Sequence, residues 1–181
     1  NLKPMKFPVI TRREAANLIN NGDNVGFSGF TPPGAPKEVP EAIAERAIEE
    51  HEAGRPFKIN LYTGASTSDR ADGVLARANA INRRAPYQNV PDLRKRINSH
   101  DVHYNDRHLS DMAQETRYGF FGKIDYAIIE AADITPDGEV ILGCGVGNIP
   151  TYAAMADKIF IELNAKLPHH QKGMKEIYKP I

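Results

Sequence analysis

The sequence has little cysteine, no tryptophan, no long apolar run and no net charge. Because Cys144 is its only cysteine, no disulfide can form within the chain, which favours a reducing compartment and predicts a cytoplasmic protein. No apolar run approaches the ~20 residues that span a bilayer, and no apolar stretch follows the first lysines, so neither a membrane partner nor a secretory signal is expected. Lysine plus arginine and aspartate plus glutamate each number 23, which argues against a nucleic-acid partner.

The residues that are present indicate an α/β protein. Hydrophobic residues make up 41% and charged residues 25% of the 181, which is typical of a globular chain. Short β-branched runs alternate with helical patterns, which predicts an open, mostly parallel sheet with flanking helices. Strands are expected at 24–30, 58–62, 125–130, 140–142 and 158–163, and helices at 12–20, 38–53, 69–81, 109–118 and 151–156.

Domain organisation follows from where this alternation fails. The stretch 82–107 is polar and contains Pro86 and Pro91, so it is expected to be an irregular excursion with a short helix near 91–98. The pattern degrades after Asn164. We therefore expect one domain over 1–164 and the start of a linker over 165–181.

A first glycine loop, from Gly26 to Lys37, joins an expected strand to an expected helix. It is no phosphate-binding Walker loop, because Ala35 occupies the lysine position and Pro32 and Pro33 remove two amides. Two interpretations stay open. Its free amides and the helix end hold a carboxylate or a developing oxyanion, or the loop only turns the chain.

A second loop contains Ser66, three residues before Asp69, and this spacing favours a helix-capping role. The alternative is that a hydroxyl of this loop faces a cleft at the carboxyl edge of the sheet. The third loop, 143–148, comes close to a dinucleotide fingerprint, but Asn148 replaces its last glycine, so a nucleotide site is only weakly indicated.

Two further groups of polar residues invite a chemical interpretation. Glu130 ends an expected buried strand, as a catalytic carboxylate often does, but pairing with a basic residue or capping a loop is the favoured interpretation. A second set combines three histidines with two aspartates in a polar segment. Its spacing matches no standard zinc site, so no metal is expected at His100, Asp101, His103, Asp106 and His108.

Several ordered stretches together carry a family resemblance. They are Gly29-Phe-Thr-Pro-Pro-Gly34-Ala-Pro-Lys-Glu-Val-Pro40, Thr63-Gly-Ala-Ser-Thr67, Ala71-Asp-Gly73, Arg84-Ala-Pro-Tyr87, Arg94-Lys-Arg-Ile-Asn98, Tyr118-Gly-Phe-Phe-Gly-Lys123, Ile129-Glu-Ala131, Gly145-Val-Gly-Asn148 and Glu162-Leu-Asn164. With these stretches the chain resembles the amino-terminal part of the acetyl-CoA hydrolase/CoA-transferase family, and within it the succinyl-CoA:acetate CoA-transferases.

The resemblance implies a CoA-transferase-type domain of an enzyme in which a glutamate attacks an acyl-CoA and becomes a glutamyl-CoA thioester. That nucleophile belongs to a carboxyl-terminal domain outside this chain, so no catalytic residue is expected here and the chain alone is expected to be inactive. Ser66 matches the family serine that faces the substrate carboxylate. Gly29, Gly34 and Thr67 are expected beside it as substrate-binding residues.

The resemblance also implies the partners. They are an acyl-CoA thioester as substrate with no permanently bound cofactor, a small carboxylate such as acetate or succinate, the protein's own carboxyl-terminal domain, and a second copy in a homodimer of the complete enzyme. Whether the acceptor is a carboxylate or water, that is, transferase against acetyl-CoA hydrolase, stays open. The alternative function from another functional class is a non-catalytic α/β sensor domain that binds a small anion.

Overall fold

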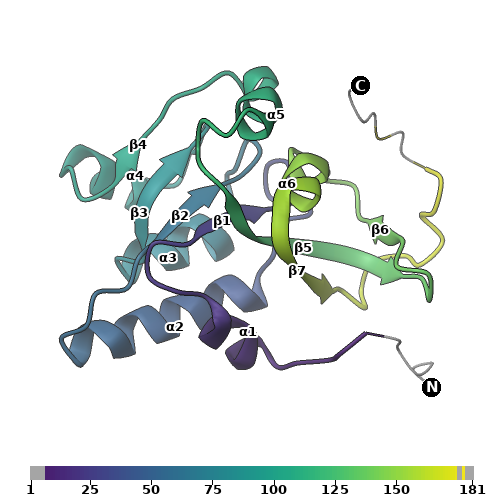
Figure 1. Cartoon of the computed structure of the whole chain (residues 1–181), viewed down its shortest axis with the longest axis horizontal. Helices are drawn as coiled ribbons and strands as arrows, with labels where there is room; N and C mark the ends of the chain where they lie inside the picture. The colour runs from purple at the N-terminus through teal and green to yellow at the C-terminus, as the bar shows by residue number, and fades with distance from the viewer. Residues whose placement is uncertain (1–6, 175–176, 178–181) are drawn as a thin grey trace.

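The structure is a computed structural model that describes residues 7–174 and Ile177. Its elements are α1 (Arg12–Leu18), β1 (Asn24–Phe27), α2 (Glu38–Glu52), β2 (Ile59–Tyr62), η1 (Asp69–Gly73), α3 (Val74–Arg77), β3 (Ile81–Ala85), α4 (Pro91–Asn98), β4 (His103–Tyr104), α5 (Leu109–Arg117), β5 (Ile124–Ile134), β6 (Val140–Leu142), α6 (Ile149–Met155) and β7 (Ala156–Leu163). The predicted open, mostly parallel sheet with flanking helices is confirmed (Figure 1).

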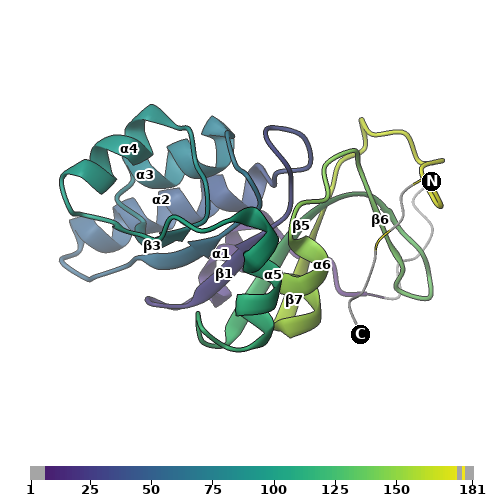
Figure 2. The ribbon, with the colours of Figure 1, turned by 90° about the horizontal axis from the view of Figure 1, so that it is seen from above.

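The sheet runs in the order β4-β3-β2-β1-β5-β6, and β7 pairs with the other edge of β5. All pairs are parallel except β5 with β6. Helices α1 to α4 cover one face and α5 and α6 cover the other, so the sheet lies between two helical layers (Figure 2). Burial on both faces explains why the central strands are nearly continuous apolar runs.

Local signals fix where the elements begin and end. Helix α1 starts at a capping box, in which the Thr11 hydroxyl accepts from the Glu14 amide at 3.1 Å and the Glu14 carboxylate accepts from the Thr11 amide at 2.7 Å. Strand β1 ends at Phe27, short of the predicted residue 30, because Gly29 adopts a positive φ of 109° that no strand continues.

Two expectations about the middle of the chain were wrong. The predicted helix 69–81 is the wide turn η1 followed by a single turn of α3, and Asn79, at φ 53°, redirects the chain into β3. The excursion predicted at 82–107 does contain the expected helix, α4, but β3 and β4 on either side of it extend the parallel sheet. Their polar residues concealed them, because Arg83 and Arg84 suggested a solvated loop.

Among the described residues, no helix combines the length and the apolar character that a bilayer crossing requires.

Candidate functional site

The carboxyl ends of β1, β2 and β5 form one edge of the sheet, where ligands of parallel α/β sheets bind. The first loop follows β1 and the second follows β2 at this edge. Strand β5 pairs with β1 as far as Ile128, continues beyond it to Ile134, and turns back as β6. Because β6 is antiparallel and Leu142 pairs with Ala131, the third loop returns to the same edge.

The three loops contact one another through the backbone atoms of their glycine residues. A Cβ placed on Gly145 would lie 2.0 Å from the carbonyl oxygen of Pro33, and one on Gly34 would lie 2.4 Å from the carbonyl oxygen of Gly145. A Cβ on Gly147 would lie 2.2 Å from the carbonyl oxygen of Gly29. A side chain at any of these positions would separate the loops. We call this contact the glycine junction, formed by Gly29, Gly34, Gly64, Gly145 and Gly147.

Most amides of the first loop already have an acceptor within the protein. Those of Ser28, Phe30 and Thr31 donate to backbone carbonyls at 3.0, 3.1 and 2.7 Å. In the described part of the chain the amides of Gly29 and Gly34 donate to no protein acceptor. Of the amides that the sequence offered to an anion, these two stay available.

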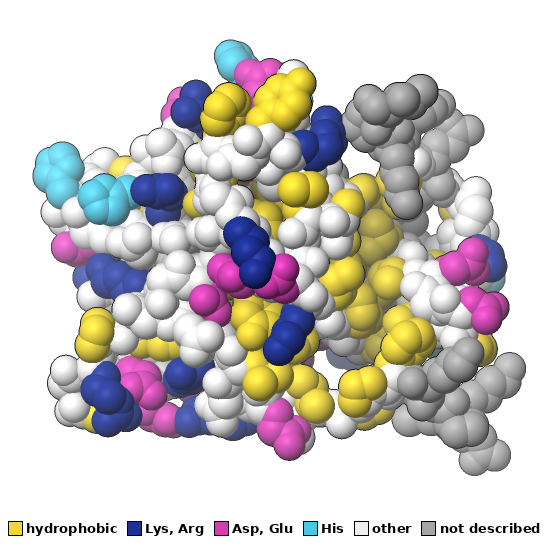
Figure 3. All heavy atoms as spheres, in the orientation of Figure 1, with side chains coloured by type: hydrophobic (Ala, Val, Ile, Leu, Met, Phe, Trp, Pro, Cys, Tyr) yellow, Lys and Arg dark blue, Asp and Glu magenta, His cyan; other side chains and the backbone are white. Residues whose placement is uncertain are grey.

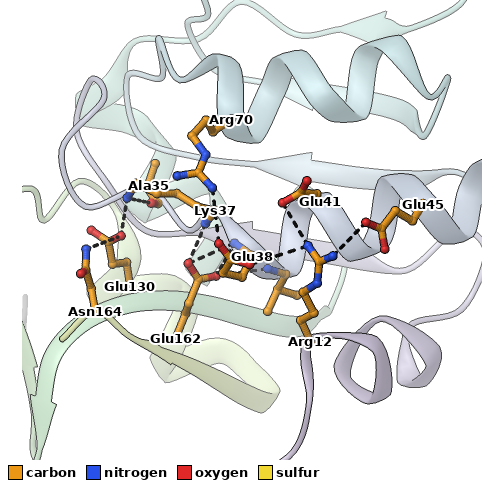
Figure 4. Close-up of polar contacts among 11 residues, drawn as sticks. Arg12, Ala35, Lys37, Glu38, Glu41, Glu45, Arg70, Glu130, Glu162 and Asn164 are labelled. Carbon is orange, nitrogen blue, oxygen red and sulfur yellow. Dashed lines mark hydrogen bonds and ion pairs between the residues drawn. The ribbon is translucent and has the colours of Figure 1, made fainter. Parts of the chain in front are cut away.

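The positive end of helix α2 is already occupied. The Glu162 carboxylate, from β7, accepts from the backbone amides of Lys37, Glu38 and Val39 at 2.8, 3.1 and 3.2 Å (Figure 4). A carboxylate at a helix N-terminus satisfies both the unpaired amides and the helix dipole. Of the two interpretations left open for this loop, the one in which the helix end holds a bound anion is not supported, since the protein supplies its own anion there.

The second loop, residues 64–69, lies beside the glycine junction and is called the Ser66 loop below. Ser66 is 7% exposed, and its amide donates to the carbonyl oxygen of Tyr87 at 3.3 Å, which extends the ladder between β2 and β3. The capping role expected for Ser66 is wrong, because the residue before η1 is Ser68 and no side chain caps that turn. Within the described residues the Ser66 hydroxyl forms no hydrogen bond, and Thr67 follows it half-buried.

A buried ion pair lies behind this loop, and the sequence gave no sign of it. The Arg84 guanidinium donates to both carboxylate oxygens of Asp72, from Nε at 2.9 Å and from Nη2 at 3.0 Å. Both side chains are fully buried. Arg84 therefore joins β3 to the turn that follows the Ser66 loop.

A second ion pair fixes the end of the first loop. The Lys37 ammonium pairs with the Glu130 carboxylate, which is 3% exposed, and also donates to the Ala35 carbonyl oxygen at 2.9 Å (Figure 4). Asn164 adds a hydrogen bond to Glu130 at 3.3 Å. The favoured interpretation of Glu130, pairing with a basic residue, is confirmed.

Helix α6 supports the site from the opposite layer. The Tyr152 hydroxyl donates to the Thr63 carbonyl oxygen at 2.7 Å, and a Cβ on Gly26 would lie 2.7 Å from the Tyr152 side chain. Burial raises the pKa of Tyr152 well above its ordinary value, so this phenol stays a neutral donor.

Two further features concern the predicted absence of a metal site and the search for a binding pocket. Across the described residues, no three histidine, cysteine, aspartate or glutamate side chains gather as a metal site requires. An open depression of about 960 Å³ lies along β3 and β4 and away from the junction, lined by residues that include Arg83, His103, Tyr104, Arg107 and Phe120.

Several known proteins are similar to this chain in sequence. The chain is 54% identical over 155 residues to the propanoyl-CoA:succinate CoA transferase of Escherichia coli, covering 86% of this chain and 32% of that protein. It is 46% identical over 180 residues to the succinyl-CoA:acetate CoA-transferase of Clostridium kluyveri, covering 98% of this chain and 32% of that protein. The chain thus spans about a third of the length of these relatives.

Solved structures share the fold at low sequence identity. RipA from Yersinia pestis matches with a TM-score of 0.67 at 20% identity, over 88% of this chain and 37% of that one. Glutaconate coenzyme A-transferase from Acidaminococcus fermentans matches with a TM-score of 0.63 at 14% identity, over 84% of this chain and 68% of that one. The fold is therefore of the CoA-transferase type.

A family model described as the acetyl-CoA hydrolase/transferase N-terminal domain matches residues 4–179, almost the whole chain. The expectation drawn from the ordered motifs is confirmed: this chain belongs to the acetyl-CoA hydrolase/CoA-transferase family and corresponds to its N-terminal domain.

Proposed function

We propose that the chain is the substrate-recognition domain of an acyl-CoA:carboxylate CoA-transferase of the acetyl- and succinyl-CoA class. The observation that carries this is its identity to two CoA-transferases, 54% and 46%, over nearly all of its length. Acetyl-CoA hydrolase is the second candidate, favoured by 37% identity to the hydrolase of Yarrowia lipolytica over 99% of this chain. The two differ in the acceptor: in the transferase a second carboxylate takes up CoA, whereas in the hydrolase water cleaves the thioester and CoA is released.

The chemistry that we propose for the complete enzyme uses a glutamate outside this chain. Its carboxylate attacks the thioester carbonyl carbon, the C–S bond breaks, and CoA leaves as the thiolate beside a mixed anhydride. The thiolate then attacks the glutamyl carbonyl, which releases the first carboxylate and leaves a glutamyl-CoA thioester. A second carboxylate reverses these steps and leaves as the new acyl-CoA.

This chain would hold the carboxylate during those steps. We propose that the Ser66 hydroxyl, which has no partner among the described residues, donates a hydrogen bond to a substrate oxygen, and that the amides of Gly29 and Gly34 add to it. Thr67 adds a second hydroxyl to the same loop. Preorganised donors of this kind stabilise a carboxylate and the charge that develops on it without reorganising during the reaction.

Exposed apolar side chains support a partner domain. They include Val9 (73% exposed), Phe120 (69%) and Tyr118 (68%). Figure 3 shows hydrophobic side chains gathered on one face, between the body of the sheet and the β6 end. Apolar area of this kind is typical of an interaction surface, so we propose that the remaining two thirds of the enzyme, and a second copy in a homodimer, cover part of it in a cytoplasmic protein.

The test is thioester exchange with succinyl-CoA and acetate. Residues 1–181 alone are expected to give no exchange, and the polypeptide that also carries the remaining two thirds is expected to give it. In that longer protein Ser66→Ala should raise KM for acetate about 10-fold or more, the contribution of one hydrogen bond to a charged group. Hydrolysis without an acetate requirement would favour the hydrolase instead.

Ser68→Ala is the matched control. Ser68 lies two residues away, is also 7% exposed, and caps no helix with its side chain, so its removal should leave KM unchanged. Exchange by residues 1–181 alone, or equal effects of the two alanines, would contradict the proposal.

A further inference from the structure

The stability of the fold does not by itself explain why the buried pair at Arg84 and Asp72 is charged. Transferring two charges into a protein interior costs several kcal/mol per ion, and an apolar pair of similar volume is often as stable or more so. The pair is also incompletely satisfied, since Nη1 of Arg84 is buried and has no partner in the described part of the chain. A residue pair selected only for stability would not keep such a group.

The pair fixes the position of the chain on either side of the Ser66 loop. The loop is attached to β3 at its start, where the Thr63 amide donates to Ala85 at 3.1 Å, and at its centre, where the Ser66 amide donates to Tyr87 at 3.3 Å. Just after the loop, Asp72 is held by Arg84 through a two-point, planar contact. Such a bidentate pair fixes both distance and orientation, which a single hydrogen bond or an apolar contact does not.

Arg84 also reaches the acceptor that Ser66 uses. Its Nη2 lies 3.5 Å from the Tyr87 carbonyl oxygen, the same oxygen that accepts from the Ser66 amide. The guanidinium thus contacts the segment on which Ser66 rests and, through Asp72, the turn into which the Ser66 loop leads. Movement of this side chain would release the loop on both sides.

We propose that Arg84 is a positioning residue for substrate binding: with Asp72 and the Tyr87 carbonyl it sets where the Ser66 hydroxyl points. This inference rests on the proposed function for its effect on the reaction, although the positioning itself is a property of the chain alone. A substrate-binding group that is displaced no longer forms its hydrogen bond, so an arginine that never touches substrate acquires an effect on KM.

The test replaces the pair by an apolar one, Arg84→Met with Asp72→Leu, so that the core stays filled while the fixed geometry is lost. In residues 1–181 the melting temperature should stay close to that of the parent, whereas amide hydrogen exchange of the peptide spanning 63–73 should quicken about 10- to 100-fold. Arg55→Met is the control, because Arg55 pairs with Glu50 at the surface, 63% exposed and outside the 63–73 segment, and its loss should leave Ser66 protected.

The kinetic arm uses the longer polypeptide. The double variant should raise KM for acetate about as much as Ser66→Ala does, and adding Ser66→Ala to it should have little further effect, because both changes remove the same contact. Unchanged exchange in the 63–73 peptide, or fully multiplicative effects on KM, would overturn the inference. So would a double variant that does not fold, since the pair would then support the whole core.

The two proposals fail in different ways. Faster loop exchange in the double variant of a longer protein that shows no thioester chemistry would overturn the proposed function and leave the positioning of Ser66 intact. Normal thioester chemistry with an unaltered KM in the double variant would do the reverse.

Discussion

Substituting alanine for Gly145 would place a methyl group 2.0 Å from the carbonyl oxygen of Pro33. A carbon and a carbonyl oxygen ordinarily approach to about 3.3 Å, so the first and third loops must separate by more than about 1 Å. Overpacking of this kind costs about 1 to 3 kcal/mol, and we expect the upper end because the new methyl group meets backbone atoms of Pro33 and Phe30 and no flexible side chain. In the complete enzyme the same displacement should reduce turnover about 100-fold.

Gly143→Ala is the matched control two residues away in the same loop. Neither glycine has a positive φ, so the two substitutions differ only in what the methyl group meets. At Gly143 it meets the end of the flexible Leu167 side chain at 3.1 Å, and we expect the free energy of unfolding to stay within about 0.5 kcal/mol of the parent. Urea denaturation of the three proteins measures both values. If Gly145→Ala proves as harmless as Gly143→Ala, the three loops do not meet through backbone and the glycine junction is refuted.

Three further predictions concern stability. Lys37→Met should lower the free energy of unfolding by about 3 kcal/mol in urea titrations, because it leaves the buried Glu130 carboxylate without its cation. Glu130→Gln should lower it by about half as much, because the Lys37 side chain is 27% exposed and water can hydrate its ammonium group. Burial, together with the nearby Asp125, raises the pKa of Asp23, so the folded state disfavours its carboxylate and stability falls as the pH rises through that pKa. Asp23→Asn should therefore stabilise the protein at pH 7, by less than about 1 kcal/mol, and the gain should vanish below about pH 4 in melts across that range. Thr11→Ala should cost about 1 kcal/mol in urea by removing the capping box of α1.

The first two of these predictions have outcomes that would contradict them. Equal losses for the two halves of the Lys37–Glu130 pair would show that the carboxylate is not the buried partner. A benefit of Asp23→Asn that grows as the pH falls would reverse the sign of the linkage. Lys172→Met, which breaks an exposed pair with Glu139, is the control for surface charge and should change the melting temperature little.

Most of the sheet could be predicted because several of its strands have a recognisable sequence pattern. The runs at 58–62, 125–130 and 140–142 are apolar and β-branched, and the structure places strands at all three. Strand β3 escaped prediction because its middle residues are Asn82, Arg83 and Arg84. A fully buried arginine cannot be distinguished from a solvated one without its partner, and Asp72 lies on another element, 12 residues away in sequence.

The site was predictable in part. The sequence indicated glycine loops at strand ends and a carboxylate, Glu130, that pairs with a base. It could not show that 143–147 joins 29–34, because that contact depends on β5 overshooting β1 and on β6 returning to the same edge. Nor could it show that Glu162 occupies the start of α2, since the two are more than 120 residues apart. Contacts of this range are set by topology and leave no local pattern.

The strand order also has a consequence for the time course of folding. Strands β1 to β4 are neighbours in sequence and can assemble with their helices in succession, whereas β5 joins β1 across about 100 residues and β7 joins β5 later still. Pairings between such distant parallel strands are slow, because the loss of chain entropy precedes the gain from contact. The contact between Gly145 and Pro33 depends on β5 and β6, so it forms only after β5 has paired with β1 and β6 has turned back along β5, and during synthesis the proposed substrate-binding edge is completed late.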